Sequence, residues 1–211
     1  MIIRDATNRN KLKFIEEKYT NIYITVMILD RNDKDTVERV ASVLRNNGSA
    51  VLPCDTIYGL SAVYGTGEAK LKTLKGRDAN KPFLVLATLS QAMELASSIP
   101  SSVLDAWPAP LTVILPYVYG GTIGIRVPDD PFLQSLLNVL GKPVYSTSVN
   151  MSGEPSLLDF DSICSAFESR VDVVVKGFDI QGKVASTLID ATVSPFRLIR
   201  QGAYDASSLI D

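Results

Sequence analysis

Short apolar runs alternate with helical patterns along most of this chain of 211 residues, and this alternation constrains the fold more than any other feature. Helical patterns fit at residues 66–74, 90–97, 131–140 and 159–168. Most of the apolar runs predict buried strands, at residues 50–52, 83–87, 111–115, 124–127, 144–145, 171–175, 187–189 and 197–199. Alternation of this kind predicts an α/β fold, in which a single mixed, twisted β-sheet is flanked by helices.

Two further helical features are clear. An amphipathic helix is predicted after Asp33, because its apolar residues fall on one face; Asp33 or Asp35 can cap its start, and Gly48 ends it. At residues 131–140, Asp130 precedes a proline at the first helical position, and Gly141 follows the last helical residue. Residues 1–26 contain no motif that we can interpret. We therefore expect an N-terminal extension of unknown role over 1–26 and one domain over 27–211.

Composition limits the classes of protein that fit. Apolar residues make up 46% of the chain, which suits one sizeable core, and a net charge of −2 argues against wholesale electrostatic attraction to nucleic acid. Any RNA contact would have to be local. With two cysteines, no signal-peptide pattern and no apolar stretch near the roughly 18 residues of a membrane span, we expect a cytoplasmic protein without membrane contact.

The chain contains no histidine. A Ser-His-Asp triad, a Cys-His dyad and any imidazole metal site are therefore excluded. Chemistry must come from positioning, from cations that stabilise the charge of a substrate, and from a metal ion that arrives with that substrate. Nucleotidyl transfer from ATP fits this description, with Mg²⁺ carried by the nucleotide and no metal ligands from protein side chains.

Two polar motifs offer suitable groups. Lys75-Gly76-Arg77 and Lys81 place cations in a loop after a helix end, a common way to hold a triphosphate, although cations there also complement the helix macrodipole. The run Ser146 to Asn150 follows a predicted strand, and its alternate side chains share a face. The alternative is a Ser/Thr-rich loop that caps the next helix.

Two other segments admit two interpretations each. Residues 53–60 leave a strand at the edge where ligands bind in α/β sheets, yet Asp55 and Thr56 could simply bond the local backbone of a turn. Arg126 lies between apolar neighbours on a predicted strand and needs an anionic partner, either a ligand or a structural carboxylate. The glycine-rich run at 120–124 matches neither the Walker pattern nor the dinucleotide fingerprint.

Taken in order, these segments resemble the YrdC-type threonylcarbamoyl-AMP synthase family, in its short, single-domain form. The resemblance covers roughly Met27 to Ala203, and the order and spacing of the pieces are more specific than any one of them. The matching pieces are Pro53 to Leu60, Lys75-Gly76-Arg77 with Lys81-Pro82, Trp107 to Thr112, Gly124 to Pro128, Thr147 to Asn150, Ser186 to Asp190 and Arg200 to Ala203.

The resemblance implies an enzyme that condenses L-threonine, bicarbonate or CO₂, and ATP into threonylcarbamoyl-AMP, with release of pyrophosphate. The product would serve threonylcarbamoyladenosine modification of tRNA through a downstream tRNA threonylcarbamoyl transferase, with at most a weak or transient tRNA contact. It also implies a YrdC-like fold with a large open cavity.

The resemblance assigns site residues by position. An L-threonine set comprises Thr56, Arg126, Ser146 and Ser186. An ATP set comprises Arg77, Lys81, Thr122, Ser148, Ser156 and Arg200. The catalytic signature comprises Lys75, Arg77, Ser148 and Asn150. The chain departs from the family pattern at Cys54, where members often carry threonine, and at Leu86, where some have histidine.

Two other functions remain open at this point. A non-enzymatic module of the same fold would bind RNA or the ribosome through the basic loop, with steep salt dependence and without need of the hydroxyls at Ser146 to Asn150. A carbamoyl-adenylate activity of the hydrogenase-maturation type uses a related domain, but within long chains with zinc-finger and acylphosphatase-like parts that are absent from this sequence.

Overall fold

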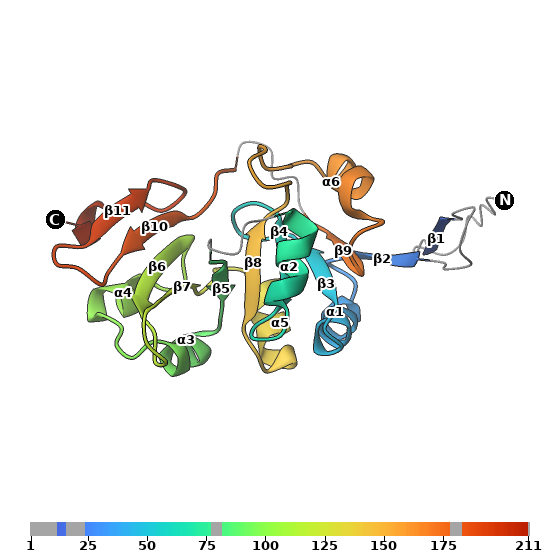
Figure 1. The fold of residues 1–211 in the computed structure, drawn as a ribbon. Helices are drawn as coiled ribbons and strands as arrows, with labels where there is room; N and C mark the ends of the chain where they lie inside the picture. The colour runs from blue at the N-terminus through green and yellow to red at the C-terminus, as the bar shows by residue number, and fades with distance from the viewer. Residues whose placement is uncertain (1–11, 16–23, 77–81, 178–182, 211) are drawn as a thin grey trace.

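In the computed structural model, which describes residues 12–15, 24–76, 82–177 and 183–210, one mixed sheet runs through the whole molecule (Figure 1). The described strands number eleven, in the order β1-β2-β9-β3-β4-β8-β5-β7-β6-β10-β11. They are β1 (Leu12–Ile15), β2 (Ile24–Asp30), β3 (Ser49–Leu52), β4 (Gly59–Val63), β5 (Leu84–Leu86), β6 (Leu111–Pro116), β7 (Thr122–Arg126), β8 (Val144–Ser148), β9 (Val173–Lys176), β10 (Thr187–Asp190) and β11 (Arg197–Arg200).

The sheet contains both parallel and antiparallel strand pairs. The parallel pairs are β2–β9, β3–β9, β5–β7 and β6–β10, and the other neighbours are antiparallel. The helices are α1 (Thr36–Arg45), α2 (Glu68–Lys75), α3 (Leu89–Leu95), α4 (Ser101–Ala106), α5 (Pro131–Leu140), α6 (Phe160–Phe167) and α7 (Ser207–Ile210). The predicted α/β class, with a mixed sheet and flanking helices, is confirmed.

Local sequence signals explain several helix ends. The Asp130 carboxylate accepts a hydrogen bond from the Leu133 backbone N–H at 3.1 Å, and Pro131 occupies the first turn, so α5 begins as predicted. Gly76 ends α2 with a φ of 57°, in the left-handed region that favours glycine. The predicted amphipathic helix begins at Thr36, and Asp35, one of its two predicted caps, occupies the N-cap position without a side-chain capping bond.

Both faces of the sheet carry apolar cores, but their extents differ. Helices α1 and α5 pack on one face, against β2, β3 and β9, in a cluster that includes Leu29, Leu52 and Leu86. On the other face, α2 and α6 cover the same strands, and a second cluster beneath α3 and α4 continues across β6, β7 and β10. Within the described chain, helices therefore cover the α1/α5 face only as far as about β5, and the rest of that face carries both polar and apolar residues.

The structure corrects three features of the sequence prediction. Residues 59–63 form the buried strand β4, where no strand was predicted. Strand β8 extends to Ser148, because Ser146 and Ser148 pair with Ser61 and Gly59 of β4. The hydroxyls of Ser146 to Ser148 thus lie on a strand and not in a loop that caps a helix. The short helix α4 was also missed.

At the N-terminal end, β2 begins at Ile24 and pairs with β9. This strand crosses the expected boundary between residues 26 and 27, and the division into an extension and a domain stays a prediction. In the described part of the chain, no helix has both the length and the apolar character needed to span a membrane.

Candidate functional site

The polar residues singled out in the sequence lie on one face of seven neighbouring strands, from β4 to β11. Side chains alternate across a strand, so the register of each pair decides which residues share a face. Ser61 pairs with Ser146, Ser146 with Leu84, and Leu86 with Arg126. Continuing across the sheet, Gly124 pairs with Ile114, and Leu188 pairs with both Thr112 and Arg200. The face that lacks helical cover therefore carries small and polar residues together with apolar ones such as Leu84, Ile114 and Leu188.

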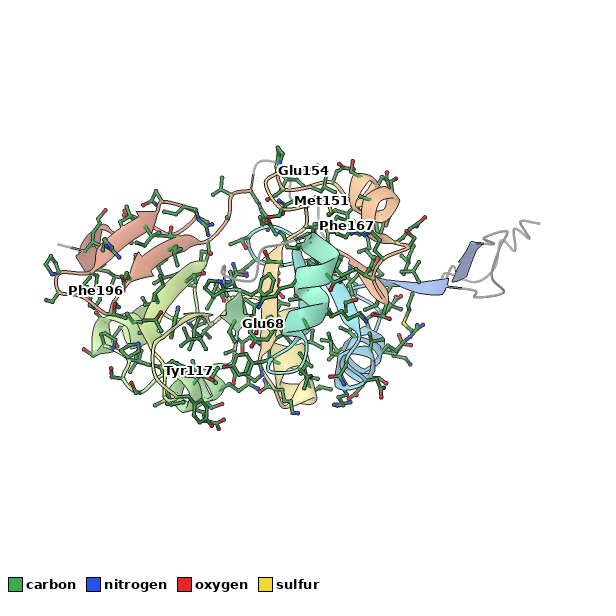
Figure 2. All side chains as sticks on the ribbon, viewed as in Figure 1. Glu68, Tyr117, Met151, Glu154, Phe167 and Phe196 are labelled. Atoms are coloured by element: carbon green, nitrogen blue, oxygen red, sulfur yellow. The ribbon has the colours of Figure 1, made fainter. Side chains whose placement is uncertain are left out.

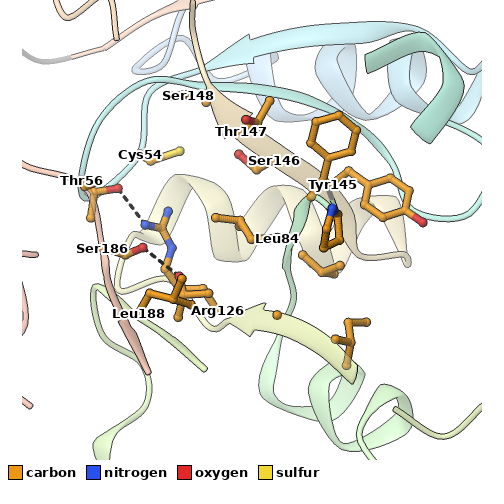
Figure 3. A pocket seen from close by; sticks show the side chains of 18 of the residues that line it. Cys54, Thr56, Leu84, Arg126, Tyr145, Ser146, Thr147, Ser148, Ser186 and Leu188 are labelled. Atoms are coloured by element: carbon orange, nitrogen blue, oxygen red, sulfur yellow. Dashed lines mark hydrogen bonds between the residues drawn. The ribbon is translucent and has the colours of Figure 1, made fainter. Parts of the chain in front are cut away.

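A cavity lies on this face of the sheet, beside the short strand β5. Strand β5 is short: Leu84–Leu86 pair with β8, and Val85 and Leu86 pair with β7. Within the described residues, Thr122, Ile123 and Gly124 of β7 are paired only with β6. Between these diverging strands lies a cavity of about 510 Å³ (Figure 3). The large open cavity implied by the resemblance is present.

All four residues of the predicted L-threonine set line this cavity: Thr56, Arg126, Ser146 and Ser186. Arg126 is 4% exposed, and its Nη1 donates a hydrogen bond to Thr56 Oγ1 at 2.7 Å, which Figure 3 shows. Its Nη2 lies 3.2 Å from Asp55 Oδ1. Arg126 therefore has a structural carboxylate beside it and also faces the cavity. Thr56 bonds Arg126, contrary to the simple turn interpretation.

A second guanidinium lies close by. Arg200 donates to the Ser186 backbone carbonyl from Nη2 at 2.8 Å and from Nε at 3.2 Å, and the Ser186 hydroxyl bonds Thr112 Oγ1 at 2.8 Å. Burial and the positive charge of Arg126 lower the pKa of Arg200 from its ordinary value. Two arginines, separated by Ser186, thus create positive potential at one end of the cavity, where an anionic group would be stabilised.

The Ser146 hydroxyl lies against a glycine on the next strand. Its only described side-chain hydrogen bond is with Ser61 Oγ, at 3.4 Å, and a Cβ placed on Gly59 would lie 2.4 Å from Ser146 Oγ. Cys54 lines the cavity on the same side, and burial raises the pKa of its thiol to about 12, so it stays protonated at neutral pH. Leu86, the other departure from the family pattern, is buried in the core beneath α5 and does not line the cavity.

Lys75 and Asn150 hold the end of β8 together. Lys75 is 3% exposed, and its Nζ donates to Asn150 Oδ1 and to the Ser148 carbonyl, both at 2.8 Å. Asn150 Nδ2 donates in turn to the carbonyls of Met151 and Glu154, which lie in the loop after β8 (Figure 2). Neither Lys75 nor Asn150 lines the cavity, and their predicted catalytic role stays a prediction.

The predicted ATP set is only partly assembled. Thr122, Ser148 and Arg200 line the cavity, whereas Ser156 lies in the loop between β8 and α6 and does not line it. Arg77 and Lys81 lie outside the described residues. The ATP assignment therefore stays a prediction.

Sequence reasoning missed several cavity residues. Thr112 belongs to a matching piece of the resemblance, but its place was visible only from the pairing of β6 with β10. Several tyrosines also line the cavity, among them Tyr64, whose Oη donates to Tyr117 Oη at 2.6 Å, and Tyr145, whose ring centre lies 4.9 Å from that of Tyr64. Tyrosines are common in cores, so no sequence signal distinguished these.

Comparison with known proteins gives a consistent result. The family model named Sua5/YciO/YrdC, with the description "Telomere recombination", matches residues 42–202. A threonylcarbamoyl-AMP synthase of Pyrococcus abyssi is 27% identical over 195 residues, which are 85% of this chain and 57% of that protein. One from Bacillus subtilis is 30% identical over 191 residues, covering 82% and 55%. The chain thus spans a little over half the length of these two relatives.

The fold comparison points the same way. The crystal structure of Pyrococcus abyssi Sua5 complexed with L-threonine has a TM-score of 0.77 and 26% sequence identity. That comparison covers 84% of this chain and 58% of the Sua5 chain.

Proposed function

This chain belongs to the Sua5/YciO/YrdC family, and from that membership we propose that it synthesises threonylcarbamoyl-AMP from L-threonine, bicarbonate or CO₂, and ATP. The arrangement of Arg126 and Arg200 around Ser186, on a polar cavity wall, is the observation that carries the proposal. A family relative with this activity and a Sua5 structure containing L-threonine support it.

In this proposal, the L-threonine carboxylate pairs with the Arg126 guanidinium, which is already held by Thr56. The hydroxyls of Ser146 and Ser186 bind the polar groups of the amino acid. A small polar molecule in a cavity of about 510 Å³ leaves room for part of a nucleotide beside it.

The chemical steps need little from the protein beyond alignment. The threonine amine combines with bicarbonate or CO₂ to give a carbamate, and a carbamate oxygen attacks the α-phosphorus of ATP as pyrophosphate leaves. Mg²⁺ arrives with the phosphates of ATP. We assign stabilisation of the phosphate charge to Arg200 with Thr122 and Ser148, and to Arg77 and Lys81 of the loop outside the described residues.

The product would pass to a tRNA threonylcarbamoyl transferase, because a mixed anhydride of a carbamate and AMP is reactive and needs an acceptor. A cytoplasmic location suits a reaction that draws on ATP and serves tRNA. A weak tRNA contact belongs to the same proposal.

The test is pyrophosphate release from Mg·ATP by the purified protein, with and without L-threonine and bicarbonate. We expect release that requires both co-substrates, together with a product of the mass of threonylcarbamoyl-AMP. Release with neither co-substrate, or no release under any combination, would contradict the proposal. RNA binding with steep salt dependence would then favour the binding-module alternative.

A further inference from the structure

Three buried polar atoms at one end of the cavity make no hydrogen bond. They are Asp55 Oδ1, Asp55 Oδ2 and Arg126 Nε, and no other buried side-chain nitrogen or oxygen in the described residues lacks a partner. An unsatisfied buried polar group typically costs about 1–3 kcal/mol, so folded proteins rarely keep one without a reason. Three such atoms in one contact indicate a functional constraint on this arginine and this aspartate.

A second buried Arg–Asp pair in the same protein does not show this lack of hydrogen bonds. Arg31 and Asp130 are 8% and 7% exposed, and two hydrogen bonds of 2.9 and 3.1 Å join them. Asp130 also accepts from the Leu133 backbone at the start of α5. This pair is well satisfied and does not line the cavity. A buried Arg–Asp pair can therefore be fully hydrogen bonded in this molecule, and the pair at Arg126 is not.

Two residues of the loop after β3 contact the Arg126 guanidinium. Thr56 accepts from Nη1, and Asp55 lies beside Nη2. Arg126 and Thr56 line the cavity, whereas the Asp55 side chain is 9% exposed and does not. Asp55 therefore does not contact a ligand in the cavity directly and would act on it through Arg126 or through its charge.

Charge gives Asp55 a second effect. Arg200 approaches Arg126 from β11, and within the described part of the chain its side chain donates only to Ser186. Two guanidinium groups at the same end of a cavity repel one another and would favour rotation of Arg126 away from Arg200. The Asp55 carboxylate, whose Oδ1 lies 3.2 Å from Nη2, offsets part of this repulsion and holds Nη2 against the loop after β3.

We propose that Asp55 is a positioning residue, which holds Arg126 in the orientation that receives the carboxylate of the amino-acid substrate. The inference rests on the proposed function, since it takes L-threonine as the molecule that Arg126 binds. Thr56 and Asp55 contact Nη1 and Nη2, which fixes the guanidinium at the cavity wall, where it can pair with the substrate carboxylate.

The experiment is calorimetric titration of L-threonine, without ATP, into the unmodified protein, Asp55→Asn and Asp130→Asn. Asp55→Asn keeps the shape of the side chain and removes its charge. Because a charge-assisted contact is worth about 1.5–3 kcal/mol, we expect the Kd for L-threonine to rise tenfold or more. Asp130→Asn breaks the matched pair away from the cavity, so its Kd should stay within about twofold of the unmodified protein.

A second measurement, the affinity for pyrophosphate, distinguishes a change in the orientation of Arg126 from a change in the charge of the site. Asp55→Asn makes the site more positive, so a purely electrostatic effect would tighten the binding of any anion. Orientation of Arg126 predicts weaker L-threonine binding together with unchanged or tighter pyrophosphate binding. Asp55→Glu, which restores a carboxylate near Nη2, should recover most of the lost affinity. If Asp55→Asn does not fold, Asp55→Ser leaves room for a water molecule beside Arg126 and takes its place.

An unchanged or lower Kd for L-threonine in the neutral variants would overturn this inference. Equal losses in Asp55→Asn and Asp130→Asn would also overturn it, because they would indicate general destabilisation. If the unmodified protein itself does not bind L-threonine, the proposed function fails and this inference fails with it. Binding by the unmodified protein with no effect at Asp55 removes only the inference.

Discussion

Replacement of Gly59 with alanine tests the placement of Ser146 in the proposed L-threonine site. Gly59 begins β4 and faces the cavity opposite Ser148. Its new Cβ would lie 2.4 Å from Ser146 Oγ and 3.4 Å from Cys54 Sγ, and contacts under 3.0 Å essentially never occur. Since the obstacle is one hydroxyl that can rotate, we expect Ser146 to turn away from the position that it now occupies.

The expected losses follow from that rotation. Overpacking typically costs about 1–3 kcal/mol. Because the Ser146 hydroxyl can rotate at the cavity wall, we expect Gly59→Ala to lower the free energy of unfolding by only about 1 kcal/mol. Loss of one hydrogen bond to the ligand is worth about 1 kcal/mol, and the added methyl group narrows the same space, so the Kd for L-threonine should rise about tenfold. Urea unfolding and calorimetric titration measure the two quantities.

Two further variants sharpen the test. Gly124→Ala is the matched control for stability, because its Cβ would lie 3.9 Å from the nearest atom, Thr112 Cγ2. It should change the free energy of unfolding by less than about 0.5 kcal/mol. The double variant Gly59→Ala with Ser146→Gly removes the clash, so it should regain stability relative to Gly59→Ala without regaining L-threonine affinity. If Gly59→Ala matches Gly124→Ala in stability and keeps its affinity, the placement of Ser146 is wrong.

Four other predictions follow from single contacts. Lys75→Met should lower the free energy of unfolding by about 3 kcal/mol, measured in urea, because it strips the buried acceptors at the end of β8 of their cation. Arg200→Gln should raise the KM for ATP about tenfold while the urea midpoint moves little, because Arg200 lies on the edge strand β11 and its described hydrogen bonds go to Ser186 alone. Burial raises the pKa of Asp172, but hydrogen bonds from a lysine and a serine lower it more, so the net shift is downward. The resulting stability is present above the unfolded pKa of about 3.9 and disappears as the pH falls through the folded pKa, so Asp172→Asn should be less stable than the parent at pH 7 and equally stable in acid. At pH 8, iodoacetamide should modify Cys164 and leave Cys54 unmodified by mass spectrometry, because burial raises the pKa of the Cys54 thiol to about 12.

The family and the fold class could be predicted from the sequence. Apolar runs and helix end signals, such as Asp130 and Gly141 around α5, depend on neighbours within a few residues. The absence of histidine was enough to exclude whole classes of catalysis. The L-threonine set was named from motif order, and all four of its residues line one cavity.

The register of the strand pairs, however, could not be predicted from the local sequence pattern. All five residues of β4 are buried, so its burial does not alternate, and only its pairing with β8 brings Gly59 next to Ser146. Asp55 and Arg126 lie far apart in the chain, and nothing near either residue predicts their contact. Thr112 and Ser186 meet because β6 and β10 are parallel neighbours.

The sequence by itself therefore determined which elements form, which chemistry is excluded and which family the motifs match, because these depend on residue type and short-range spacing. Tertiary structure alone decided which of the polar residues meet. Strand order and register are set by packing of both sheet faces at once, which involves residues far apart in the chain. The partnership of Arg126 with Asp55 and the opening between β7 and β8 arise at that level.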